Sequence, residues 1–116
     1  MADVKISKRR SGDVTVLDLG GKITMGEGNV SLRAAIRRLV EGGKKKVLLN
    51  LAEVGYVDSS GVGELVAGFT TLRREGGQLK LLNLTGKIRD LLAITKLLTV
   101  FDVYEDEATA LNSFRG

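Results

Sequence analysis

The residues with the clearest chemical potential stand together in mid-chain, in the run Asp58-Ser59-Ser60-Gly61-Val62-Gly63. Polar side chains at a helix start lie beside free backbone N–H groups and the positive end of the helix dipole, which together favour an anionic group. Asp and Ser are also ordinary helix N-cap residues. One cap residue would suffice, however, and three in a row followed by two glycines exceed what capping needs. The residues alone therefore leave a functional site and a simple helix start equally supported.

The chain has no His and no Cys, which removes most hydrolase chemistry. A Ser-His-Asp or Cys-His nucleophile system cannot be assembled, and neither can a zinc site of thiolate or imidazole ligands. The carboxylates near the serines are Asp58, Glu53 and Glu64. A helix cap, a turn residue and a first-turn helix charge account for all three. We therefore expect a protein that is not an enzyme and has no cofactor and no metal.

Length and composition predict a single domain over residues 1–116 with an aliphatic core, since 43% of the residues are hydrophobic and 4% aromatic. Residues 1–50 carry 11 Lys or Arg against five Asp or Glu. Such a basic half could face nucleic acid or an acidic partner. Without interleaved aromatic residues it is better interpreted as a solvated surface, so we expect no nucleic-acid partner. No apolar run is long enough for a membrane span, and the expected location is the cytoplasm.

The first half of the chain predicts a hairpin and a helix. Extended runs at residues 4–6 and 14–19 flank the turn Ser11-Gly12-Asp13, and so short a turn makes the strands antiparallel. We expect Gly20-Gly21 to end the second strand. An amphipathic helix closed by Gly42-Gly43 should follow. Its apolar face would comprise Leu32, Ala35, Ile36, Leu39 and Val40.

The second half alternates strands and helices. The apolar run at residues 47–51 is typical of a strand buried on both faces, and a loop and a second helix ending at Gly76-Gly77 should follow. Further strands are expected at 79–84 and 100–103, a third helix at 85–92 and a terminal helix at 108–114. This order predicts an α/β fold: a mixed sheet with an antiparallel N-terminal hairpin strand, parallel strands joined by right-handed crossovers, and about four helices packed against it. The serines then lie at the carboxyl end of a buried strand, where ligands and partners usually bind.

The serine run and its flanking elements resemble the signature of bacterial anti-anti-sigma factors, the anti-sigma factor antagonist type of the STAS family. The resemblance extends over nearly the whole chain. Besides residues 58–63, it includes the glycine-led turn Gly21-Lys22-Ile23, the central strand at 47–51, the helix-to-strand break Gly76-Gly77 and the third helix at 85–92. It implies the STAS fold.

The resemblance also implies a function and site residues. The first serine after the aspartate is the family's phosphate acceptor, which corresponds to Ser59. The unphosphorylated domain would bind an anti-sigma factor that is a serine kinase with a histidine-kinase-like ATPase fold, and so release a sigma factor. Phosphorylation would end that binding, and a serine/threonine phosphatase would reset it. By the same resemblance Asp58 would orient the acceptor, while Ser60, Gly61 and Gly63 would shape the helix start for the approach of the kinase.

One departure from the family pattern concerns the partner surface. The family usually has an aspartate after the glycine-led turn, whereas this chain has Thr24 followed by Met25-Gly26-Glu27-Gly28. We therefore include Thr24 among the partner-binding residues, on a surface that is expected to differ from that of the family. Two alternatives stay open: a non-switching STAS subunit of a larger signalling or lipid-transport complex, and a nucleotide-binding regulatory module.

Overall fold

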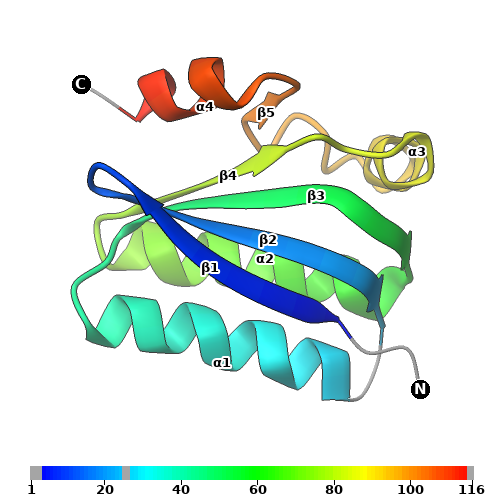
Figure 1. Cartoon of the computed structure of the whole chain (residues 1–116). Helices are drawn as coiled ribbons and strands as arrows, with labels where there is room; N and C mark the ends of the chain where they lie inside the picture. The colour runs from blue at the N-terminus through cyan, green and yellow to red at the C-terminus, as the bar shows by residue number, and fades with distance from the viewer. Residues whose placement is uncertain (1–3, 25–26, 115–116) are drawn as a thin grey trace.

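A five-stranded mixed sheet organises the chain (Figure 1). The computed structural model describes residues 4–24 and 27–114, and excludes the side chains of residues 27–31. Along the chain the elements are β1 (Lys5–Ser11), β2 (Val14–Ile23), α1 (Glu27–Glu41), β3 (Lys46–Val57), α2 (Ser59–Arg74), β4 (Gln78–Leu82), α3 (Gly86–Ile94), β5 (Val103–Tyr104) and α4 (Glu107–Ser113). The strands lie in the order β1-β2-β3-β4-β5; β1 pairs antiparallel with β2, and the other pairings are parallel. The predicted α/β fold with its antiparallel hairpin strand is confirmed.

Helices cover both faces of the sheet (Figure 1). Helices α1 and α2 lie side by side on one face, and α4 lies on the other beside β4 and β5. Side chains alternate between the two faces along β2: Leu17 and Leu19 join the larger core cluster under α1 and α2, while Val14 and Val16 join the smaller one under α4. β3 contributes to both clusters through Leu49 and Leu48, so the expectation of a strand buried on both faces is confirmed.

Three strands run further than predicted. β1, which is expected at residues 4–6, continues to Ser11. β2 does not end at Gly20-Gly21 but continues to Ile23, pairing in parallel with β3 across register shifts on both sides of the glycines. Gly21 adopts a φ of 89°, which a glycine tolerates without strain, so the pair forms a bulge and not a strand end. β3 likewise continues to Val57, and the loop that was expected before the second helix is strand.

The last strand is shorter than predicted. Only Val103 and Tyr104 pair with β4, whereas Val100 and Phe101 lie in the connection before β5. Phe101 is buried there and meets Phe69 of α2 edge to face, with ring centroids 5.3 Å apart. Phe101 is therefore a core residue that lies in a loop. The pattern of apolar residues in the sequence does not distinguish such a residue from one in a buried strand.

Some of the basic residues in the first half form ion pairs at the surface, where their side chains remain exposed to solvent. Arg9 of β1 bonds Asp18 of β2 (Nε to Oδ2, 2.6 Å) and Glu107 of α4 (Nη2 to Oε1, 2.6 Å). These bonds raise the pKa of Arg9 and lower the pKa of both carboxyl groups. Arg33 of α1 makes a two-pronged ion pair with Glu64 of α2.

None of the helices in the described ranges has the length and apolar composition that crossing a bilayer requires.

Candidate functional site

The serine run forms the first turn of α2, directly after β3. Val57, the last residue of β3, pairs with Ile23, the last residue of β2. Asp58 is the one residue between β3 and α2, and α2 begins at Ser59. The two longest strands of the sheet therefore end side by side, and their ends hold the start of α2 in place.

Asp58 fixes the helix start through three hydrogen bonds. Its carboxylate Oδ1 accepts from the Gly61 amide at 2.8 Å, and its carbonyl accepts from the Val62 amide at 3.0 Å. Its own amide donates to the carbonyl of Ile23 at 3.3 Å, across to the end of β2. The carboxylate thus serves as an N-cap, and no hydrogen bond between it and the Ser59 hydroxyl is found in the described part of the chain. If Asp58 orients the Ser59 hydroxyl, it does so indirectly, by fixing the position of the first turn of α2.

The two serines differ in how far solvent reaches them. Ser59 is exposed and Ser60 is half-buried, and neither hydroxyl has a hydrogen-bond partner among the described residues. The first N–H groups of a helix have no partner within the helix, and they carry the positive end of its dipole. Ser59 therefore combines an accessible hydroxyl with surroundings that favour an added anion.

The two glycines of the run differ in how closely they pack. Gly61 is buried, and a Cβ atom there would lie 2.1 Å from the Ile23 carbonyl oxygen and 2.8 Å from a methyl carbon of Val57. No larger residue fits, so Gly61 allows α2 to pack on the ends of β2 and β3. Gly63 is exposed, and a Cβ there would meet nothing within 4 Å. Internal packing therefore explains Gly61 and leaves Gly63 unexplained.

Thr24 lies at the same end of the sheet. Thr24 directly follows Ile23, the residue that contacts both Asp58 and Gly61. The Thr24 side chain is half-buried. The prediction of a glycine-led turn before Thr24 is wrong, because Gly21-Lys22-Ile23 forms the last part of β2. Met25 and Gly26 lie outside the described residues, and Glu27 and Gly28 already belong to α1.

A groove beside Ser59 was not predicted. It has a volume of about 470 Å³ and lies between the end of β3 and α3; we call it the β3–α3 groove. Its lining is Tyr56, Val57, Asp58, Ser59, Lys87, Asp90, Leu91 and Ile94. Tyr56 and Ile94 are 47% and 78% exposed, so two large side chains present apolar surface to solvent in the same groove. The third helix was expected from the sequence, but the direction of Ile94 depends on how α3 packs, and spacing alone does not give it.

The carboxylates around the site do not converge. Glu64 is engaged with Arg33, Asp58 caps α2, and Glu53 is exposed on β3. Within the described ranges, no group of three or more acidic, His or Cys side chains could hold a metal ion. The geometry presents an accessible hydroxyl at a helix start beside an apolar groove.

Comparison with known families gives one match that covers most of the chain. The family model described as the STAS domain matches residues 5–110. The anti-sigma-B factor antagonist of Bacillus subtilis is 33% identical over 96 residues, which cover 83% of this chain and 85% of that protein.

Solved structures show the same fold. The chain is similar to an anti-sigma factor antagonist from Mycobacterium paratuberculosis, with a TM-score of 0.84 and 23% identity over 98% of this chain and 96% of the other. It is also similar to the Bacillus cell fate determinant SpoIIAA in its phosphorylated form, with a TM-score of 0.75 and 21% identity over 96% of this chain and all of the other.

Proposed function

The chain belongs to the STAS domain family, and from this membership we propose that it is an anti-sigma factor antagonist switched off by phosphorylation of Ser59. In its unphosphorylated form it binds an anti-sigma factor that is a serine kinase with a histidine-kinase-like ATPase fold, and the sigma factor is released. A serine/threonine phosphatase restores the unphosphorylated form. The chain itself binds and does not catalyse.

One observation carries the choice of Ser59. It is the exposed serine of the pair, at the first residue of α2, whereas Ser60 is half-buried in the same turn. A kinase must bring its ATP γ-phosphate to the hydroxyl, which requires that the hydroxyl be accessible. The name of the Bacillus subtilis relative, an anti-sigma-B factor antagonist, supports the proposed role as an antagonist. The similar structure of SpoIIAA in its phosphorylated form supports regulation by phosphorylation.

The other residues of the site have supporting roles in this proposal. Asp58 caps α2 and so fixes the place of Ser59, and Gly61 lets the helix start rest on the ends of β2 and β3. Gly63 leaves open backbone on the exposed side of α2, where a partner can approach closely. Thr24 and Ser60 border the same surface, and Thr24 replaces the family's usual aspartate there.

The test is a phosphorylation assay with the cognate anti-sigma kinase and ATP. We expect one phosphate on the wild-type chain, mapped to Ser59 by mass spectrometry, and none on Ser59→Ala. Ser60→Ala serves as the matched control and should accept phosphate at Ser59 as the wild type does. Phosphate on Ser60, or a cognate anti-sigma factor that binds the chain but leaves Ser59 unmodified, would overturn the proposal and favour a non-switching subunit.

A further inference from the structure

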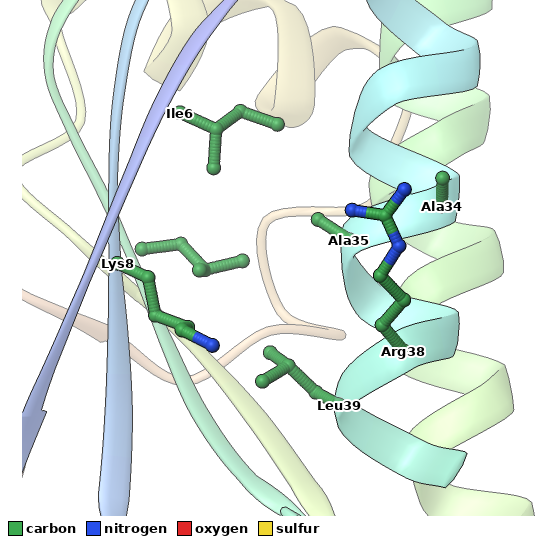
Figure 2. A pocket seen from close by; sticks show the side chains of 7 residues that line it. Ile6, Lys8, Ala34, Ala35, Arg38 and Leu39 are labelled. Carbon is green, nitrogen blue, oxygen red and sulfur yellow. The ribbon is translucent and has the colours of Figure 1, made fainter. Parts of the chain in front are cut away.

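A second hollow lies between the β1–β2 hairpin and α1, and Ser59 is not among its lining residues (Figure 2). Its volume is about 440 Å³. The floor is apolar, built by Ile6 of β1, Leu17 of β2, and Ala35 and Leu39 of α1. Leu17 and Leu39 are buried beneath it, while Ile6 and Ala35 are half-buried at its surface.

Two cations border this apolar floor. Figure 2 shows Lys8 reaching from β1 toward the hollow, and Arg38 lying along α1 on the opposite wall. Both side chains are exposed, and neither has an ion pair or hydrogen bond with any described residue. None of the described residues that line the hollow carries a carboxylate. Arg9 and Arg33, on the same two elements, are paired with carboxylates, whereas Lys8 and Arg38 have no ion-pair partner among the described residues and lie beside apolar surface.

We propose that this hollow binds a single-chain amphiphile with an anionic head group, such as a free medium-chain fatty acid. The acyl chain lies on the apolar floor, and the head group lies between Lys8 and Arg38, where charge-assisted hydrogen bonds are available. The volume is within the range of about 300–1,000 Å³ that is typical of small-molecule sites. This site does not depend on the function proposed for Ser59.

The experiment is a calorimetric titration of the full chain with octanoate, decanoate and laurate, below their micelle concentrations. While the chain still fits the floor, affinity should rise about fourfold per added methylene, the factor that corresponds to about 0.8 kcal/mol. Dodecyl phosphate should bind like laurate, because the site recognises negative charge. Dodecyltrimethylammonium, with the same chain and a cationic head, should bind at least tenfold more weakly.

Two double variants separate the proposed site from the general charge of the protein. Lys8→Glu with Arg38→Glu should weaken laurate binding at least tenfold. Lys5→Glu with Arg37→Glu makes the same change in net charge on the same two elements but outside the hollow, and should weaken binding less than threefold. Absence of saturable laurate binding, equal binding of the cationic amphiphile, or equal losses in both double variants would each overturn the proposal. Partner binding and phosphorylation at Ser59 are separate readouts and do not bear on it.

Discussion

At the residue scale, the members of the serine run have separate tasks. The Asp58 carboxylate is occupied by the Gly61 amide, and Gly61 is buried against Ile23. Ser59 and Gly63, both exposed, have no such internal contact among the described residues. The sequence predicts the cap, because Asp is a preferred N-cap residue. It does not predict why position 61 is glycine, because that close contact depends on the ends of β2 and β3 lying side by side.

The two glycines of the run provide a matched pair of alanine variants. Gly61→Ala forces a Cβ into the Ile23 carbonyl and should lower the free energy of unfolding by about 1–3 kcal/mol, the usual cost of overpacking. Gly63→Ala adds a Cβ in open space on a helix and should raise that free energy by up to about 1 kcal/mol. Urea denaturation of both variants measures the difference. Equal changes in stability would show that the contact at Gly61 is not close.

At the element scale, hydrophobic patterns predict which elements exist but not where they end. Leu32, Ile36 and Leu39 recur at helical spacing, and α1 forms where they predict it. β2 and β3 run past their predicted ends because they continue to pair with each other across the bulge at Gly20-Gly21. The apolar pattern predicts a strand at Phe101, whereas this residue packs into the core from a loop. In each case the missing information is a tertiary contact.

The β3–α3 groove provides a prediction about the extent of the partner surface. If the partner contacts the groove beside Ser59, Ile94→Lys should weaken its binding at least about tenfold, or 1.4 kcal/mol. Because Ile94 is 78% exposed, the melting temperature should hardly change. Val100→Lys is the control, since Val100 is also an exposed apolar residue but lies outside the groove. Equal affinities for wild type and Ile94→Lys would place the partner surface elsewhere.

The ion pairs of Arg9 predict how stability depends on pH. Arg9 lowers the pKa of Asp18 and Glu107 below their ordinary values of 3.8 and 4.5. Groups with a lowered pKa in the folded state stabilise it above the unfolded pKa, and that stabilisation is lost as the pH falls through the folded pKa. Stability should therefore decline below about pH 4.5, and Arg9→Met should reduce this acid-dependent part. Chemical denaturation between neutral and acidic pH measures it, and an unchanged pH profile in Arg9→Met would contradict the assignment.

At the scale of the whole molecule, the phosphate that we propose on Ser59 would have opposite consequences for folding and for binding. It adds about −1.5 to −2 charges at neutral pH. In the free chain that charge lies at the N-terminus of α2, where an anion typically gains about 0.3–1 kcal/mol. In a complex that places a negative charge of the partner about 4 Å away, the repulsion costs about 4 kcal/mol at an effective dielectric constant near 20. The second effect is larger, so the modification should weaken binding strongly without disturbing the fold.

The most direct test is a titration of the cognate anti-sigma factor with the chain in its unphosphorylated and Ser59-phosphorylated forms, with thermal denaturation of both forms alongside. The account predicts that phosphorylation weakens binding at least about a hundredfold, or 2.7 kcal/mol, while the melting temperature stays the same or rises by a few degrees. Ser59→Asp should lose binding at least in part, and Ser59→Ala should bind as the unphosphorylated form does. Equal affinity of the two forms, or a loss of binding that coincides with unfolding, would contradict the proposal that Ser59 is a switch.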